Sequence, residues 1–334
     1  MPLTNDPPEV PAVYAQGMAE FIEKFTSTVP DDMYTLPIDE QRRLYRSLPT
    51  TFPYRRPPGL RVDDAVLPGP DGDVRVRVYR PATPAGPGVL CYSRGDGFCL
   101  GDLDTHDTVA AELADRTGYP VVFVDVRSAP EHPFPAAVHD LRAVIEALAE
   151  RPDRFGIAPG PLGLVGDSSG GNLMVANCLL ARDRGGPDIA CHGLVSPVLD
   201  FFRWHDEGPD APILSSGEMR FYASCYTRNP QELLDPLVSP LRTARFDGLP
   251  PATILATELD SLRQDAVDYA QRLIDAGVRV ELRVEPGLVH APLRARSMCP
   301  AAARAWEDFC SSVGRLLRQA DPALHPPLVA GAAD

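Results

Sequence analysis

The stretch Gly166-Asp167-Ser168-Ser169-Gly170-Gly171 decides the fold class of this chain. It follows an apolar run, Leu162 to Val165, and precedes a helix-like run, Asn172 to Leu180. This order of a buried strand, a sharp turn and a helix is typical of a nucleophile elbow. In such an elbow the small residues of the turn leave a serine hydroxyl exposed at the end of a sheet strand. A Gly-x-Ser-x-Gly pattern alone is weak evidence, but this context predicts that Ser168 is a nucleophile rather than part of an ordinary Gly/Ser-rich loop.

A serine nucleophile needs a histidine base and a carboxylate that orients the base, and both candidates follow in chain order. The buried-strand pattern of residues 251–256 leads into Asp260, and the strand-like residues 278–284 lead into His290. Each candidate therefore stands on a loop that follows a strand. The order predicts Asp260 as the carboxylate and His290 as the base.

Other residues compete for these roles. Glu258 and Asp265 are alternative carboxylates on either side of Asp260. The remaining histidines lack the position after the last strand, so we interpret them as structural or surface residues: His106, His132, His139, His192, His205 and His325.

Several further segments strengthen this interpretation through their order and spacing. They are Ala129-Pro130-Glu131-His132-Pro133-Phe134-Pro135-Ala136, Asp235-Pro236 with Ser239-Pro240-Leu241, Asp260-Ser261-Leu262-Arg263 and Gly287-Leu288-Val289-His290. With the serine stretch, these segments resemble the bacterial hormone-sensitive-lipase-like family of alpha/beta-hydrolase esterases over about residues 60 to 320. The resemblance implies an α/β fold with a mostly parallel central sheet flanked by helices, a helical cap, and activity on short- to medium-chain acyl esters.

The chain departs from the family in the loop Arg94-Gly95-Asp96-Gly97-Phe98, where the family carries His-Gly-Gly-Gly. In the family this loop supplies two backbone N–H groups to the oxyanion hole, and a third comes from the residue after the nucleophile. The resemblance therefore implies an oxyanion hole built from the amides of Gly97, Ser169 and Asp96. A carboxylate at position 96 is unexpected, because an anion near a developing oxyanion raises the barrier that the hole lowers.

The Asp96 substitution leaves three alternatives. In the first, Asp96 points away from the pocket and pairs with Arg94, so that the hole still works. In the second, Asp96 or Arg94 contacts a polar or charged group of the substrate. In the third, hydrolysis is partly abandoned and Asp96 serves as an additional acid or base in acyl transfer, elimination or ring closure.

Composition agrees with a soluble globular enzyme. The 334 residues are 44% hydrophobic and 23% charged, and the formal net charge of −14 argues against nucleic acid or an anionic membrane as the main partner. The seven cysteines form no C-x-x-C and no ligand-like cluster with histidine, which argues against a metal site or a disulfide framework. No cofactor is implied, and no residue pattern predicts an oligomeric state. The absence of a signal-like N-terminus or a long apolar run predicts a cytoplasmic protein with no membrane span.

The pattern along the chain predicts one hydrolase core interrupted by an excursion. Strands are expected at 88–92 and 121–125, with an edge strand at 74–79, and helices at 13–25, 38–48, 107–117, 136–150 and 265–276. We predict an N-terminal cap segment at 1–55, a core at 56–200 and 246–320, a cap excursion at 201–245 and a tail at 321–334 that frays. Aromatic residues of the excursion are expected in the pocket wall or in cap packing: Phe201, Phe202, Trp204, Phe221, Tyr222 and Tyr226, together with Met219.

The function predicted from these features is a serine carboxylic-ester hydrolase that forms an acyl-enzyme with a small or medium acyl ester or lactone. The first alternative is a lyase, cyclase or acyltransferase of specialised metabolism, because the Arg94–Gly97 loop departs from the family sequence at the loop that supplies the oxyanion hole for hydrolysis. A non-catalytic small-molecule receptor is the weaker alternative, since the expected Ser, Asp and His are all present.

Overall fold

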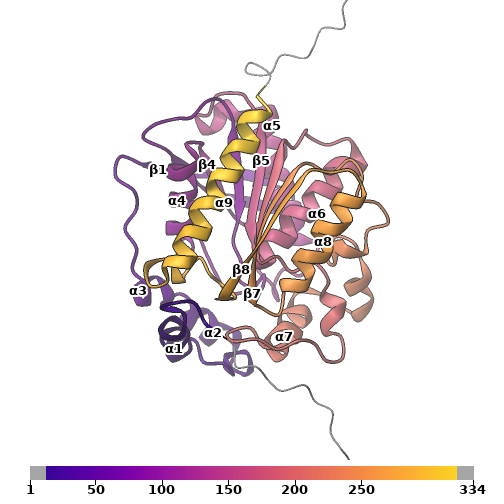
Figure 1. Ribbon diagram of the computed structural model, residues 1–334. Helices are drawn as coiled ribbons and strands as arrows, with labels where there is room; N and C mark the ends of the chain where they lie inside the picture. Colours follow the sequence, from indigo (N-terminus) through magenta and orange to yellow (C-terminus); the bar gives the residue numbers. More distant parts are fainter. Residues whose placement is uncertain (1–12, 322–334) are drawn as a thin grey trace, which may run out of the picture.

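A computed structural model describes residues 13–321, and the central feature is an eight-stranded sheet with the order β1-β2-β4-β3-β5-β6-β7-β8 (Figure 1). The strands are β1 (Arg61–Gly69), β2 (Gly72–Arg80), β3 (Val89–Ser93), β4 (Val121–Asp125), β5 (Leu162–Asp167), β6 (Cys191–Val195), β7 (Ala252–Leu259) and β8 (Val280–Val289). β1 and β2 run antiparallel to their neighbours, while every pair from β4 to β8 is parallel. The expected mostly parallel α/β fold is confirmed.

Helices cover both faces of this sheet. The α-helices are α1 (Met18–Thr28), α2 (Ile38–Tyr45), α3 (Leu48–Thr51), α4 (Asp107–Thr117), α5 (Ala136–Glu150), α6 (Ser168–Arg184), α7 (Ser216–Tyr226), α8 (Arg263–Asp275) and α9 (Pro300–Gln319). α4 packs against α9 in front of the strands in Figure 1, and α5 packs against α6 behind them. Burial on both faces explains why β3 and β4 are continuous apolar runs.

Short 3-10 helices fill the connections between these elements. They are η1 (Met33–Thr35), η2 (Pro152–Phe155), η3 (Phe201–Trp204), η4 (Pro230–Leu234), η5 (Pro240–Arg242) and η6 (Ala295–Ser297). Three of them, η3 to η5, lie with α7 in the predicted cap excursion, where the strand and helix alternation breaks. Figure 1 shows α1, α2, α3 and α7 gathered at one end of the sheet.

Three predicted elements need correction. Residues 74–79 do not form an edge strand, because β2 pairs with β4 on one side and with β1 on the other. β1 has a mostly exposed, charged sequence that lacks an apolar alternation, so its pattern gave no strand signal. The first helix begins at Met18 rather than near Val13, and the second ends at Tyr45 before a separate turn of helix. Most of the tail predicted to fray lies outside the described residues.

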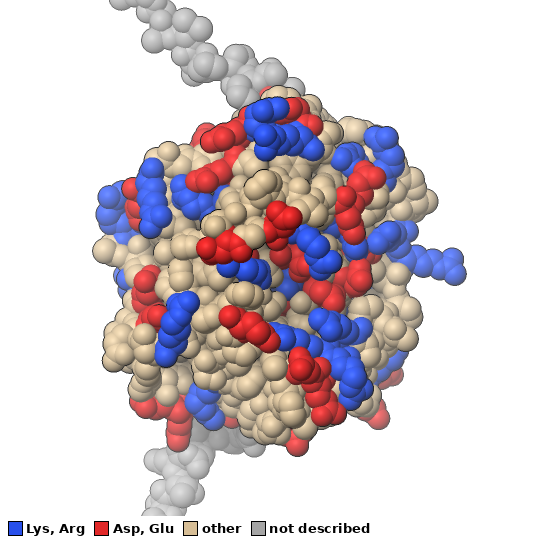
Figure 2. Space-filling view, turned by 180° about the vertical axis from the view of Figure 1, so that it is seen from behind, with Lys and Arg blue, Asp and Glu red and all other residues tan. Residues whose placement is uncertain are grey.

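The surface carries both charge signs in close alternation. Figure 2 shows Lys and Arg side chains interspersed with Asp and Glu over the face behind the view of Figure 1. Exposed ion pairs of the described residues include Arg151 with Asp153 at 2.9 Å and Arg245 with Asp247 at 3.1 Å. Among residues 13–321, no helix is both long and apolar enough to cross a membrane.

Candidate active site

Ser168 lies where β5 ends and α6 begins, in a backbone conformation that few non-glycine residues adopt. Its φ is 48°, which is the strained left-handed geometry of a nucleophile elbow. The turn depends on its glycines: a Cβ at Gly166 would lie 2.5 Å from the Gly170 backbone, and one at Gly170 would lie 2.2 Å from the Ser93 carbonyl oxygen. Only glycine therefore lets α6 start this close to β3 and β5, and the serine faces a cavity.

His290 and Asp260 meet at the ends of the two last strands of the sheet. His290 Nδ1 lies 2.9 Å from Asp260 Oδ2, although the residues are 30 positions apart. The carboxylate is fixed by two further donors, Thr257 Oγ1 to Oδ2 and the Leu262 amide to Oδ1, both at 2.9 Å. With Nδ1–H donating to the carboxylate, His290 keeps Nε2 available to accept a proton. His290 and Ser168 line the same cavity.

The electrostatics of this pair suit a base. Burial lowers the pKa of His290, but the Asp260 carboxylate outweighs burial, so the pKa lies above the usual value. Burial likewise raises the pKa of Asp260, and the His290 partner with its hydrogen bonds brings that pKa below the usual value. The pair therefore favours an ionised Asp260 and stabilises a proton on His290.

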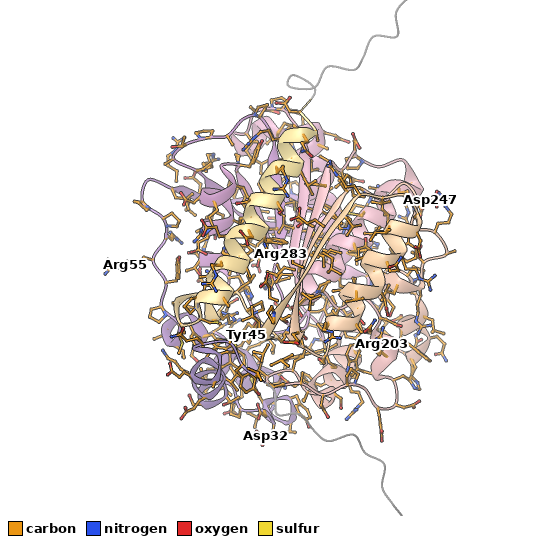
Figure 3. All side chains as sticks on the ribbon, viewed as in Figure 1. Asp32, Tyr45, Arg55, Arg203, Asp247 and Arg283 are labelled. Carbon is orange, nitrogen blue, oxygen red and sulfur yellow. The ribbon has the colours of Figure 1, made fainter. Side chains whose placement is uncertain are left out.

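Neither competing carboxylate contacts His290. Glu258 Oε2 accepts a hydrogen bond from the Gly287 amide at 2.8 Å and holds a backbone turn. Asp265 is fully buried, accepts from the amides of Leu199 and Asp200, and pairs with Arg203 at 2.9 Å. Arg203 lies beside the end of α8 in Figure 3. Both carboxylates thus have structural partners of their own.

The altered loop contains a buried ion pair. Arg94 Nε lies 2.6 Å from Asp96 Oδ2, and the two side chains are 2% and 4% exposed. The same carboxylate oxygen accepts from the Gly101 amide at 2.9 Å, while Arg94 Nη2 donates to the Gly101 carbonyl at 2.8 Å. Asp125 provides a second carboxylate at 3.3 Å from Arg94 Nη1. This pairing with Arg94 is the one that the first alternative for Asp96 requires, although Asp96 is also among the residues that line the cavity.

The expected oxyanion donors differ in what they contact. The Asp96 amide donates to Ser169 Oγ at 3.0 Å, and the Phe98 amide lies 3.3 Å from the same oxygen. Within the described residues the Gly97 amide has no such partner, and Ser169 belongs to the first turn of α6, whose amides have no intrahelical acceptor. The amides of Gly97 and Ser169 are therefore the donors left for an oxyanion. The Asp96 amide, which was also expected to donate, is engaged by the Ser169 hydroxyl.

The cavity in front of Ser168 has a volume of about 70 Å³ and is lined by both apolar and polar residues. The apolar residues include Val198, Phe201, Ile213, Leu214, Met219 and Tyr222. Three of these residues, Phe201, Met219 and Tyr222, belong to the aromatic segment expected in the pocket wall. Others of that segment pack elsewhere: Tyr226 stacks on Phe98 at 3.7 Å and Trp204 is buried.

The lining of the cavity also contains polar residues that were not predicted as part of the site: Tyr45, His106, Asp167 and Arg294. Tyr45 Oη donates to the Gly95 carbonyl at 2.8 Å, and its ring stacks on that of His106. Figure 3 shows Tyr45 near the ends of β7 and β8. Asp167 belongs to the serine stretch, but Tyr45, His106 and Arg294 come from three other segments, so no single motif predicts the group.

The remaining histidines and cysteines show no sign of a metal site. His192 is buried with Nε2 at 3.0 Å from Tyr269 Oη, and burial lowers its pKa to about 4. His325 lies outside the described residues. Within residues 13–321, no three His, Cys, Asp or Glu side chains are arranged to hold a metal ion, and all seven cysteines are free thiols.

Comparison with known proteins identifies relatives over most of the chain. A family model described as alpha/beta hydrolase fold matches residues 90–294. Carboxylesterase NlhH of Mycobacterium tuberculosis is 37% identical over 281 residues, covering 80% of this chain and 84% of that protein. Ethyl acetate hydrolase of Pseudomonas putida is 34% identical over 283 residues, covering 81% and 87%. The hyperthermophilic esterase of Pyrobaculum calidifontis superposes with a TM-score of 0.80 at 29% identity, covering 89% of this chain and 97% of that structure.

Proposed function

Because this chain belongs to the hormone-sensitive-lipase-like family of alpha/beta-hydrolase esterases, we propose that it hydrolyses carboxylic esters through an acyl-enzyme on Ser168. The chain is a carboxylesterase-like hydrolase, as its named relatives indicate. The observation that carries the finer proposal is the 2.9 Å contact between His290 Nδ1 and Asp260 Oδ2, on the cavity that Ser168 lines.

Each residue has one role in the proposed reaction. His290 Nε2 takes the hydroxyl proton of Ser168 as the oxygen attacks the ester carbonyl, and Asp260 holds the imidazole and stabilises its charged form. The amides of Gly97 and Ser169 hold the oxyanion of the tetrahedral intermediate. His290 then passes its proton to the leaving alcohol. Water activated by the same histidine releases the acid from Ser168.

The altered loop is compatible with hydrolysis. A lone carboxylate beside the oxyanion would oppose the reaction, but the Asp96 charge is compensated by Arg94 and by the Gly101 amide. This pairing supports the hydrolytic proposal over a lyase, cyclase or acyltransferase, since it removes the reason for invoking one. The proposed partner is a small-molecule ester or lactone with a small or medium acyl group, and a cytoplasmic location stays a prediction from the sequence.

Initial rates on p-nitrophenyl esters from acetate to decanoate test this proposal. We expect wild-type turnover that is lost in Ser168→Ala, because removing the nucleophile of such an enzyme lowers kcat by about 10⁶-fold. Ser224→Ala is the matched control: its hydroxyl donates to the Phe221 carbonyl on the exposed side of α7. Equal turnover by wild type and Ser168→Ala would contradict the assignment of the nucleophile.

A further inference from the structure

Arg294 is a cation that lines the catalytic cavity, and its hydrogen-bond partners among residues 13–321 are uncharged. Its Nη1 lies 3.2 Å from the Thr105 carbonyl, and its Nη2 lies 3.1 Å from Tyr45 Oη and 3.2 Å from His106 Nε2. His106 is neutral, because burial and the nearby arginines hold its pKa well below the usual value. No carboxylate of residues 13–321 lies within 4.0 Å of the Arg294 guanidinium.

The buried arginines near the site have carboxylate partners, whereas Arg294 is partly exposed and has none within 4.0 Å among the described residues. Arg94 pairs with Asp96 at 2.6 Å, and Arg296 lies 2.7 Å from Glu112. A buried charge normally has a partner of opposite sign, because leaving it unpaired is costly. Arg294 lines the cavity that holds Ser168 and His290, and it also lines a neighbouring cavity beside Tyr54.

The guanidinium also has donors to spare. Arginine carries five N–H groups in a planar fork. The contacts to the Thr105 carbonyl and to Tyr45 Oη use one hydrogen of Nη1 and one of Nη2, and the tautomer of His106 with an unprotonated Nε2 accepts the second hydrogen of Nη2. Nε–H and one hydrogen of Nη1 have no hydrogen-bond acceptor among residues 13–321. The Tyr45 ring lies 5.0 Å from the guanidinium carbon and fixes its position through a cation–π contact. The group is held in place while part of its hydrogen-bonding capacity stays free.

Three acidic residues line the cavity, and each has a partner other than Arg294. Asp96 pairs with Arg94. Asp167 Oδ1 accepts from Tyr92 Oη at 2.6 Å, and Oδ2 lies 3.8 Å from His106 Nε2. Glu218 Oε2 accepts from the Ser215 amide at 2.9 Å and completes the cap of α7. Burial raises the pKa of Asp167 and of Glu218, which disfavours their charged forms, although the charge of Arg294 acts to lower the pKa of Asp167. Since none of the three carboxylates lies within 4.0 Å of the guanidinium, the position of a contacting counter-ion is left for a ligand.

We propose that Arg294 is a specificity-determining residue that binds a carboxylate on the alcohol part of the ester substrate. This inference rests on the proposed function. Arg294 follows His290 by four positions in the same loop, and His290 is the group that passes a proton to the leaving alcohol. The alcohol part therefore lies toward this loop, and the substrate class is an acyl ester of a hydroxy acid. Arginine recognises carboxylates with strong, charge-assisted hydrogen bonds.

The test compares 4-acetoxybenzoate with methyl 4-acetoxybenzoate, two esters that differ in the charge of one group. Wild type should prefer the carboxylate ester in kcat/KM. In Arg294→Gln that preference should fall about ten- to hundredfold, mainly through the KM of the carboxylate ester, because a hydrogen-bonded charge is lost. Arg294→Lys should restore part of the preference. Arg43→Gln, which removes an exposed charge from α2, is the control and should leave the preference unchanged.

Three results are distinguishable. An equal loss on both esters in Arg294→Gln would show that the residue only supports the fold, which overturns the inference. Ser168-dependent hydrolysis by wild type without a preference for the carboxylate ester would also overturn it and would leave the proposed function standing. No Ser168-dependent hydrolysis of either ester would contradict both.

Discussion

The hydrogen bond between His290 and Asp260 is the residue-scale feature on which the mechanism depends. Asp260 raises the pKa of His290 against the effect of burial. The reaction needs a neutral imidazole, so activity should rise with pH through the pKa of His290. Because that pKa is raised, the acid limb of kcat/KM should lie above about pH 6.5, the ordinary value for histidine. The raised pKa of His290 contributes stability that is full below the unfolded pKa of histidine and is lost as pH rises through the folded pKa. The lowered pKa of Asp260 contributes stability that is lost as pH falls through the folded pKa of that carboxyl group.

Asp260→Asn should lower kcat by about 10⁴-fold, because an amide stabilises the wrong tautomer of the histidine. With burial unopposed, the acid limb of the residual activity should also move to lower pH. A pH-rate profile of p-nitrophenyl acetate hydrolysis measures both effects. Glu258→Gln, which keeps an acceptor for the Gly287 amide, is the control and should retain the wild-type profile. An unshifted acid limb in Asp260→Asn would argue against the pairing.

Asp96→Asn tests the buried pair in the altered loop. The change leaves Arg94 buried with Asp125 as its remaining carboxylate at 3.3 Å. Breaking a buried ion pair costs about 3 kcal/mol or more, so the free energy of unfolding from urea denaturation should fall by that order. Asp153→Asn breaks an exposed pair with Arg151 and should leave the unfolding midpoint unchanged. Equal stability of Asp96→Asn and wild type would show that the Asp96 charge is not needed in the loop.

At the scale of elements, the close packing of α6 against β3 sets the position of the nucleophile. A methyl group at Gly170 would meet the Ser93 carbonyl oxygen at 2.2 Å. Relieving that contact needs a backbone shift, and overpacking of this kind costs about 1–3 kcal/mol. The shift would also move Ser168 relative to His290.

Gly170→Ala should therefore lose both stability and most of its esterase activity, as measured by thermal unfolding and initial rates. Gly314→Ala is the matched control in α9, where the added methyl finds no atom nearer than 3.5 Å. It should be neutral or stabilising by up to about 1 kcal/mol, since alanine favours the helix. Full activity in Gly170→Ala would mean that the elbow tolerates a wider turn.

Across the whole molecule, features with a local sequence pattern could be predicted, whereas features that depend on contacts between distant segments could not. The patterns that predict the serine elbow and the strands before Asp260 and His290 lie in adjacent residues, so these three residues could be selected from chain order alone. In the fold, Ser168 and His290 line one cavity and Asp260 contacts His290. The pairing of Arg94 with Asp96 was one of three alternatives that the sequence left open. The fold favours this alternative because it buries the two side chains against each other. β1 gave no signal because its residues are mostly exposed.

Most of the polar residues that line the cavity could not be predicted from such local patterns. Tyr45 comes from α2, His106 precedes α4, and Arg294 follows β8. The periodicity of these segments does not distinguish the three residues from ordinary surface residues. Their side chains come together only in the complete fold. The position of Arg294 shortly after His290 was the one sequence signal that could have drawn attention to it.

The proposed reaction depends on Ser168 as the nucleophile of a carboxylic-ester hydrolase. Treating the protein with a p-nitrophenyl phosphonate and locating the adduct by peptide mass spectrometry tests this role directly. We expect one adduct on the peptide that contains Ser168, released nitrophenol in equal amount, and no adduct in Ser168→Ala. An adduct on another residue, or equal labelling of Ser168→Ala, would contradict it.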